Sequence, residues 1–355
     1  MRTSALAVAV IGVGILVCGA LGAADLEKIY KDCDTCGPDW ITNTVPPYKG
    51  YARGWALISA DELKELWDAQ VAWNNRDTIG NGEAPKENPK LVIVDVGKPA
   101  LHYRAEGHIP GAFNTWREDY DSGVKVWDDV PAENILSRED FQAYLRRFGI
   151  DNDSQVVFYD HKYDATRLWW ACKLYGFNVR VLDGGFNAWK DAGYEVDRLS
   201  SPSQPAPGNV VLKGGEPLIN VSHGAVYKCK DDPMWMLWDI RSTEEITGER
   251  NRAKRMGAIP WSKALVPWKE VHGEDGTFLD ANQLKTMVID KHGFDEAAHH
   301  VFFCQSGVRV TQTMFALYLY GYPLEHLHIY DDSWIWWGNN PDTPIIDENG
   351  EPVTL

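Results

Sequence analysis

The chain has 355 residues and a formal net charge of −16, from 35 Lys and Arg against 51 Asp and Glu. The length predicts two domains, and a hydrophobic share of 44% excludes a chain that is disordered throughout. The acidic excess argues against a nucleic-acid-binding surface, because phosphate binding depends on Lys and Arg. Six Cys are too few for a scaffold built on disulfides.

Residues 1–24 have the order of a secretory signal peptide. Arg2 precedes an unbroken apolar run over residues 5–17, and small residues follow up to Ala24. This order predicts cleavage near Ala24 and export, most simply to a periplasm. The alternatives are an uncleaved anchor that holds the protein outside the cytoplasm and lipid attachment at Cys18.

An amino-terminal extension, residues 25–55, carries a Cys-x-x-Cys pattern at Cys33 and Cys36. In an oxidising compartment this pattern favours a local disulfide. A zinc site would need two more ligands, and haem attachment would need His in place of Gly37. A relay dithiol is a further alternative, tied to the carrier function considered below.

The rest of the chain repeats itself. Four segments match four later ones in the same order: VIVDVG (92–97) with MLWDIR (236–241), 110–112 with 256–258, 156–177 with 301–322, and VLDGGFNAW (181–189) with IYDDSWIWW (329–337). Their offsets are 144, 146, 145 and 148 residues. We therefore predict duplicated domains at 56–199 and 217–345, a Ser/Pro-rich linker at 200–216 and a tail at 346–355.

Each copy has the same order of elements. A β-branched run ends at Asp, a turn rich in Gly and Pro follows, and a second apolar run leads into a helical segment before a third short run. Strands that alternate with helices predict an α/β fold, in which each copy has a mainly parallel sheet with helices on both faces. Residues 74–90, rich in Asn, Gly and Pro, predict a long surface loop.

The second apolar run of the second copy is followed by a loop with a candidate nucleophile, Cys304. Cys304 follows this strand at its carboxyl end, where parallel sheets bind ligands. Gly307 lets the chain curl so that the amides of residues 305–309 point back at the sulfur, and a helix from about Arg309 adds its positive end. In such a solvent-facing turn we expect a nucleophilic thiolate, with Arg309 holding an anionic substrate bidentately. An inert buried thiol is the competing interpretation.

The chain resembles the tandem-domain rhodaneses, a family of sulfurtransferases, over residues 56–345. The supporting motifs are GHIPGA (107–112), the helix motif at 167–170, LDGGFNAW (182–189), the six-residue loop 304–309 and YDDSW (330–334). The resemblance implies a silent first domain and a persulfide on Cys304, with no metal or organic cofactor. Under the ungapped match, Tyr159 takes the cysteine position of the first copy and Gly97 replaces the Arg matched by Arg241.

The length of the loop separates two chemistries. Phosphatase-like and arsenate-reducing relatives place five residues between Cys and Arg, whereas four separate Cys304 from Arg309 here, as in sulfur-transferring members. We therefore expect Cys304 to take the outer sulfur of thiosulfate and pass it to cyanide or a thiol. The predicted substrate-binding residues are Gln305, Ser306, Gly307, Val308, Arg309 and Arg241.

Mercaptopyruvate is the alternative donor. Relatives that use it resemble Cys-Gly-Ser-Gly-Val-Thr at the loop, and Gln305 and Arg309 depart from that pattern. In those relatives the loop Ser is thought to work with a first-domain His and Asp, which match His108 and Asp95 here. A structural role for this pair, tying the strand end to its turn, is an equal alternative.

A third function is an exported sulfur or selenium carrier, or binding protein, that delivers to a redox partner. Two departures bear on the site. Tandem members usually carry a second Arg at the position of Glu245, which the basic residues among 250–255 would replace unless they are only a solvated face. Trp334, after the third run, would shield the persulfide or pack between the domains.

Overall fold

The computed structural model describes residues 48–74, 90–123, 125–127, 130–131, 134–263 and 266–353. The predicted leader, the pair Cys33 and Cys36, and most of the loop predicted at 74–90 lie outside these residues. Across the part of the chain that is described, no helix is long and apolar enough to cross a bilayer.

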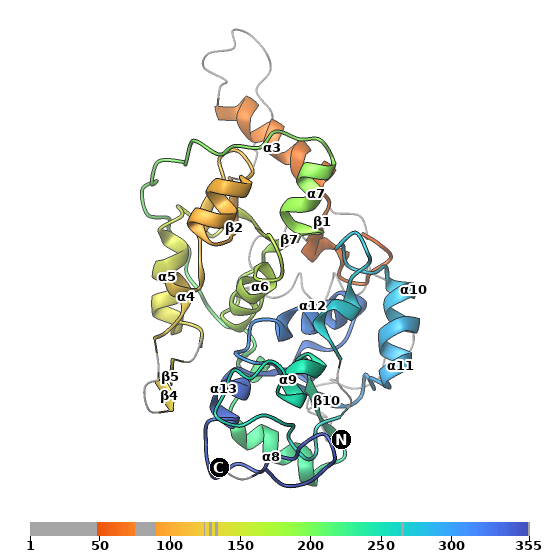
Figure 1. Cartoon of the computed structure of the whole chain (residues 1–355). Helices are drawn as coiled ribbons and strands as arrows, with labels where there is room; N and C mark the ends of the chain where they lie inside the picture. The colour runs from red at the N-terminus through yellow and green to blue at the C-terminus, as the bar shows by residue number, and fades with distance from the viewer. Residues whose placement is uncertain are drawn as a thin grey trace, which may run out of the picture.

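The first domain is built on a five-stranded parallel sheet with strand order β1-β7-β6-β2-β3 (Figure 1). Its strands are β1 (Leu57–Ile58), β2 (Leu91–Val96), β3 (Phe113–Thr115), β6 (Gln155–Asp160) and β7 (Arg180–Leu182). Its helices are η1 (Gly54–Ala56), α3 (Ala60–Asn74), the π-helical η2 (Pro99–Glu106), α4 (Arg117–Tyr120), α5 (Arg138–Arg146), α6 (Ala165–Leu174) and α7 (Gly185–Asp191). A short hairpin, β4 (Lys125–Trp127) and β5 (Val130–Pro131), extends from it.

The sheet of the first domain is buried on both faces. Along β6, Val156 and Phe158 pack into the cluster that contains α6, while Val157 and Tyr159 pack into the cluster that contains residues of α3 and α7. Successive side chains of a strand point to opposite faces, so a continuous apolar strand requires helices on both sides. The fold class predicted from the sequence is confirmed.

The second domain repeats this plan with a four-stranded parallel sheet, order β8-β11-β10-β9. Its strands are β8 (Asn220–Val221), β9 (Trp235–Asp239), β10 (His299–Phe303) and β11 (Leu327–Tyr330). Its helices are η3 (Pro217–Ile219), α8 (His223–Asp231), α9 (Thr243–Thr247), η4 (Trp268–Val271), α10 (Ala281–Leu284), the π-helical η5 (Lys285–Ile289), α11 (Asp290–His292), α12 (Val310–Tyr320), η6 (Leu324–His326) and α13 (Ser333–Trp337). A parallel bridge between Trp238 and Lys263 occupies the place of a fifth strand.

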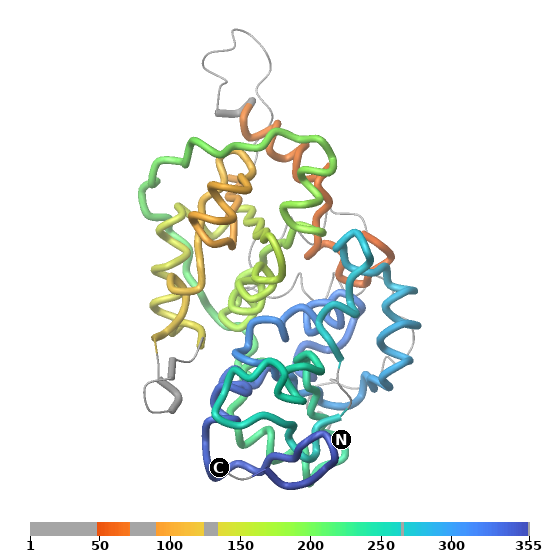
Figure 2. Tube along the Cα trace, in the orientation of Figure 1, coloured from red at the N-terminus to blue at the C-terminus, as the bar shows by residue number. Residues whose placement is uncertain are grey.

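The two domains meet along α6 and α12, which lie side by side in the middle of the molecule (Figures 1 and 2). One apolar cluster runs through both domains, from Tyr51 to Ile329. At the crossing, the hydroxyls of Thr166 and Thr311 share a hydrogen bond of 2.7 Å. These two threonines occupy the same place in the two repeats, at the offset of 145 residues.

Strand pairing corrects the predicted match between the two copies. Asp95 lies opposite Tyr159, and its counterpart Asp239 lies opposite Phe303. Tyr159 therefore corresponds to Phe303, and Asp160, not Tyr159, stands where the second domain has Cys304. The ungapped match was wrong here because the second loop is one residue longer, so the helix offset of 145 does not extend back into the strand, where it is 144.

Candidate active site

Cys304 lies directly after β10 and is pinned by the start of α13. Its N–H donates to the hydroxyl of Ser333 at 3.3 Å, and its carbonyl accepts from the N–H of Trp334 at 3.0 Å. The residue is only 1% exposed. The solvent-facing turn expected from the sequence is therefore wrong in its depth, because α13 closes over the strand end.

The loop after Cys304 curls in the way that Gly307 predicts. Gly307 has φ +75°, and a Cβ there would lie 2.3 Å from an oxygen of Asp331, so only glycine fits. Within the described part of the chain, the backbone N–H groups of Gln305, Gly307, Val308 and Arg309 donate to no other residue. Consecutive free amides at a helix start favour an anion.

The side chains of the other predicted loop residues are largely committed to the protein. Gln305 donates from Nε2 to the carbonyl of Arg252 at 3.0 Å, and Ser306 and Val308 are buried. Among the described residues, the unused hydrogen-bond donors of this loop are therefore backbone N–H groups.

Arg309 is the residue before α12 and forms a bidentate ion pair with Glu245. Its two terminal nitrogens lie 2.7 and 2.8 Å from the two carboxylate oxygens. Burial lowers the pKa of Arg309, but the hydrogen bond to Glu245 and the nearby Cys304 outweigh burial and raise it. The guanidinium is therefore near the thiol, as expected. However, it binds a carboxylate of the protein, whereas we expected it to be available to the substrate.

Arg241 is fully buried and is also paired, with Asp239. Its Nε and Nη2 donate to that carboxylate at 2.7–3.1 Å, and Nη2 also donates to the carbonyl of Gly257 at 2.7 Å. Its guanidinium lies 3.8 Å from the ring centre of Trp334. Among described residues, Nη1 of Arg241 has no hydrogen-bond partner, so one donor remains for a substrate oxygen.

Trp334 packs inside the second domain. Its ring belongs to the apolar cluster of the face covered by α8 and α13, and its indole N–H donates to the carbonyl of Arg255 at 3.2 Å. The expected packing of this ring between the domains is wrong. Its position under Arg241 makes it a platform for the guanidinium.

The first domain contributes directly to the loop of the second. Arg167 of α6 is fully buried and reaches the carbonyl of Gly307 at 3.1 Å and Asp331 at 2.6 Å. Its counterpart on α12, Gln312, reaches back to the carbonyl of Tyr163 at 3.0 Å. Each domain therefore holds the strand-end loop of the other, a contact that the sequence motif at 167–170 did not reveal.

The corresponding loop of the first domain is filled by its own carboxylate. The oxygens of Asp160 accept from the N–H groups of Lys162 and Ala165 at 2.8 and 2.6 Å. Burial raises the pKa of Asp160 to about 7, against the lowering effect of these amides. The side chain of Asp160 thus occupies in the first domain the place that Cys304 has in the second, and two backbone amides donate to it there.

Asp95 and His108 lie in the first domain and bond within it. Asp95 accepts from His161 at 3.0 Å, and His108 bonds through Nδ1 to the carbonyl of Tyr103 at 2.9 Å. In the described ranges, the side chains of this pair make no hydrogen bond to the loop of Cys304. The geometry favours the structural interpretation, in which they fix the end of β2 and the following turn.

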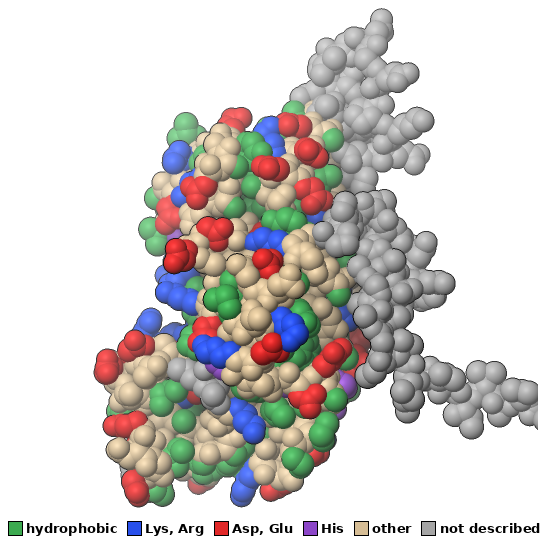
Figure 3. Space-filling view, turned by 90° about the vertical axis from the view of Figure 1, so that its right-hand side faces the viewer, with side chains coloured by type: hydrophobic (Ala, Val, Ile, Leu, Met, Phe, Trp, Pro, Cys, Tyr) green, Lys and Arg blue, Asp and Glu red, His purple; other side chains and the backbone are tan. Residues whose placement is uncertain are grey.

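The basic residues of 250–255 divide into two groups. Arg255 is buried and donates to the carbonyl of Thr343 at 2.9 Å and to other carbonyls after α13, so it is a structural residue. Arg250, Arg252 and Lys254 are exposed. On the face drawn in Figure 3, basic and acidic side chains are interspersed and no large patch of one sign stands out.

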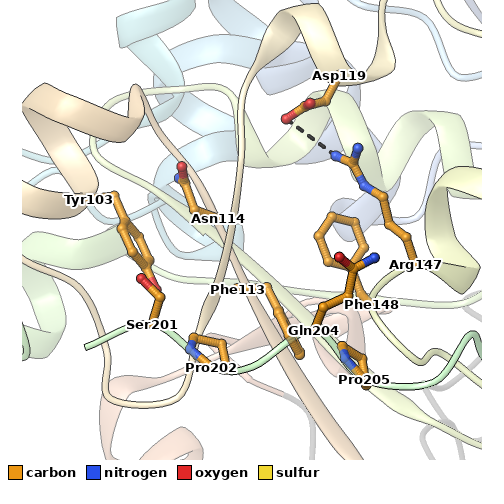
Figure 4. A pocket seen from close by; sticks show the side chains of 10 residues that line it. All are labelled: Tyr103, Phe113, Asn114, Asp119, Arg147, Phe148, Ser201, Pro202, Gln204 and Pro205. Carbon is orange, nitrogen blue, oxygen red and sulfur yellow. Dashed lines mark ion pairs between the residues drawn. The ribbon is translucent and has the colours of Figure 1, made fainter.

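A cavity of about 350 Å³ lies in the first domain, under the interdomain linker. Figure 4 shows Tyr103 beside Ser201 and, across the cavity, the ion pair of Arg147 with Asp119, which measures 3.2 Å. All of its lining residues belong to the first domain or the linker. Among the described residues, no group of three or more His, Cys, Asp or Glu is arranged to hold a metal ion.

Comparisons with known proteins agree with this architecture. Residues 81–192 match the model of the rhodanese-like domain. The sulfur carrier protein TtuD of Thermus thermophilus is 32% identical over 83% of this chain and 98% of its own length. A protein of Haloferax volcanii, provisionally named a thiosulfate sulfurtransferase, is 32% identical over 72% of this chain and 88% of its own length.

The fold is also found in solved structures. The anaerobic ergothioneine biosynthesis enzyme of Chlorobium limicola superposes with a TM-score of 0.64 at 22% identity, over 87% of this chain and 74% of that one. At this identity the likeness shows the fold alone. With the paired parallel sheets, the strand-end loop and the relatives above, the chain belongs to the rhodanese family of sulfurtransferases and sulfur carriers.

Proposed function

We propose that the protein transfers a sulfane sulfur from thiosulfate to a thiol or cyanide through a persulfide on Cys304. The observation that carries this proposal is the position of Cys304 at the end of β10, followed by four loop amides that no described residue uses. At the matching place of the first loop, two backbone amides donate to the carboxyl oxygens of Asp160, which supports amide donation to a ligand atom at this strand end.

The reaction has two steps. The Cys304 thiolate attacks the outer sulfur of thiosulfate, the S–S bond of the donor breaks, and sulfite leaves with the bonding pair. The acceptor thiolate or cyanide then attacks the outer persulfide sulfur and regenerates the Cys304 thiolate. The loop amides stabilise the negative sulfur in both states, and Nη1 of Arg241 is the donor left for a sulfonate oxygen.

The donor assignment has a second support. Use of mercaptopyruvate was predicted to involve His108 and Asp95, and both side chains bond within the first domain. Among the described residues, neither side chain bonds to the loop of Cys304, which favours a donor that needs no general acid from this pair.

The decisive experiment replaces Cys304 with Ser. We expect the variant to fold, to gain no sulfur on treatment with thiosulfate, and to lose turnover with every donor, while the wild type gains one sulfur atom by intact mass. Cys172 is the internal control: it is buried in α6, burial raises the pKa of its thiol, and Cys172→Ser should leave turnover unchanged. Persulfide formation in Cys304→Ser would overturn the assignment.

A carrier role is the second candidate. The depth of Cys304 favours it, because a buried persulfide is protected from free thiols and waits for a partner that fits the loop. We would expect slow turnover with small thiols and fast transfer to an exported redox protein. Export itself is proposed from the leader; finding the intact leader on cytoplasmic protein would contradict it.

A further inference from the structure

A buried array of charges surrounds the loop of Cys304. Arg309 pairs with Glu245, and Arg241 pairs with Asp239. All four residues are buried. Two guanidinium groups and two carboxylates cancel formally, so the site that receives the donor has no net positive charge before the thiolate forms.

Glu245 stays ionised in this array. Its side chain is only 2% exposed. Burial raises the pKa of Glu245, but the hydrogen bond and the charge of Arg309, with a further contribution from Arg241, lower it overall. A negative charge is therefore fixed on the guanidinium nearest to the sulfur.

Glu245 also occupies the donors that an oxyanion would use. Both terminal nitrogens of Arg309 point at its carboxylate, which is the bidentate geometry in which Arg holds carboxylates and oxyanions. A substrate that binds Arg309 must share these donors and lie a few ångströms from a like charge. In a site shielded from water, that repulsion is strong and grows with the charge of the substrate.

We propose that Glu245 is a specificity-determining residue that disfavours the thiosulfate dianion relative to donors of low charge, such as a neutral organic persulfide. This inference rests on the persulfide on Cys304 in the proposed function; it keeps thiosulfate as a donor that can react and names donors of low charge as the ones that the same site prefers. With such a donor, R–S–SH, the Cys304 thiolate attacks the terminal sulfur, the S–S bond of the donor breaks, and RS⁻ leaves and takes up a proton. No other reactant is required.

The test compares two donors on the purified full-length protein. The rate at which Cys304 gains one sulfur is followed by intact mass with thiosulfate and, separately, with benzyl persulfide. We expect Glu245→Gln to raise the rate with thiosulfate about tenfold, because one unit of repulsion is removed, and to change the rate with benzyl persulfide much less.

The matched control is Glu62→Gln in the first domain. Glu62 also binds a buried guanidinium bidentately, with distances of 2.6 and 2.9 Å to Arg180, so its removal alters the charge of the chain equally without touching the loop. We expect its donor ratio to equal that of the wild type.

Two outcomes would overturn the proposal. One is a change of the same factor with both donors, which would make Glu245 a structural partner of Arg309; the other is a fall in the thiosulfate rate alone. If Glu245→Gln does not fold, Glu245→Ala provides the test, because it removes the same negative charge; an unchanged donor ratio in that variant would contradict us. Failure of the wild type to gain sulfur from either donor would instead refute the proposed function itself.

Discussion

The two strand-end loops of this protein occupy matching places in the two sheets and differ in the residue that follows the strand, Asp160 in one and Cys304 in the other. In the first domain, Asp160 turns its carboxylate onto the amides of its own loop. In the second, Cys304 takes the same place, and four loop amides have no partner among described residues. The first loop is satisfied internally, whereas the second has donors left for a ligand.

The residues that precede α6 and α12 also differ, because one is acidic and the other is basic. Asp164 precedes α6 and pairs with Arg117 at 2.7 Å, whereas Arg309 precedes α12. A negative residue complements the positive end of a helix and a cation opposes it. Arg309 therefore lowers the stability of the second loop, and Glu245 partly compensates by pairing with it. Such local destabilisation is typical of functional sites.

The largest expected effect comes from removing the cation of the second loop. Arg309→Met takes away the guanidinium that stabilises the negative sulfur, and we expect kcat/KM with thiosulfate to fall about a hundredfold or more. Asp164→Asn, at the matching place of the first loop, should lower the melting temperature slightly and leave kcat/KM unchanged. Equal losses in the two variants would show that the loops do not differ in function.

A smaller effect is expected from the contacts that cross between the domains. Arg167→Lys keeps the charge beside Asp331 but cannot hold both Asp331 and the carbonyl of Gly307. We expect kcat to fall about tenfold, because a displaced loop no longer holds the persulfide in position. Steady-state kinetics at saturating donor would check this.

A variant of Gln312, the counterpart of Arg167, tests the contact in the opposite direction. Gln312→Leu removes the reciprocal contact, from α12 to the carbonyl of Tyr163 in the strand-end loop of the first domain. It also removes the hydrogen bonds of Gln312 with Thr166 and His272. The variant should cost about 3 kcal/mol in the free energy of unfolding, about 1 kcal/mol for each hydrogen bond, and leave kcat within about twofold. A tenfold loss of kcat here as well would mean that the domain interface as a whole matters, and not the individual loop.

The smallest effect concerns pH. Burial raises the pKa of Asp160 to about 7, so the folded protein holds a proton that the unfolded chain has already lost. For His161, burial lowers the pKa, but Asp95 and Glu106 raise it more, and the result is again a folded state that keeps its proton longer. Stability should therefore fall as pH rises, by about 1 kcal/mol between pH 6 and pH 8 for Asp160.

Urea unfolding at the two pH values measures this slope. Asp160→Asn should flatten it, because the side chain no longer titrates. The part of the slope that comes from His161 should remain, whereas an undiminished slope in Asp160→Asn would show that Asp160 is not its main source.

Much of the fold could be predicted from the sequence, because the segments that match between the two halves are strands and helices with recognisable apolar patterns. Four matches in one order identify two alike domains, and the position of Cys304 after an apolar run places it at the end of β10. The sequence could not show whether Tyr159 or Asp160 matches Cys304, because this depends on which of the two lies opposite Asp95 in the sheet. That pairing is a tertiary fact.

The charged contacts around Cys304 could not be predicted from the sequence. Glu245 was recognised as a departure from the family pattern, but it meets Arg309 across 64 residues of chain. Arg167 reaches Gly307 across 140 residues and from the other domain. Neither contact leaves a local signal, because each depends on how α6 and α12 pack.

The hydrogen bond between Thr166 and Thr311 has a consequence for the origin of the molecule. A residue that touches its own counterpart marks a twofold axis, and contacts that are exchanged in both directions around it are those of an isologous C2 dimer. Fusing two such subunits into one chain makes their association independent of protein concentration. With the partner permanently attached, the half that carries Asp160 needs no thiol of its own, because its Arg167 still contacts the loop of Cys304 in the other half.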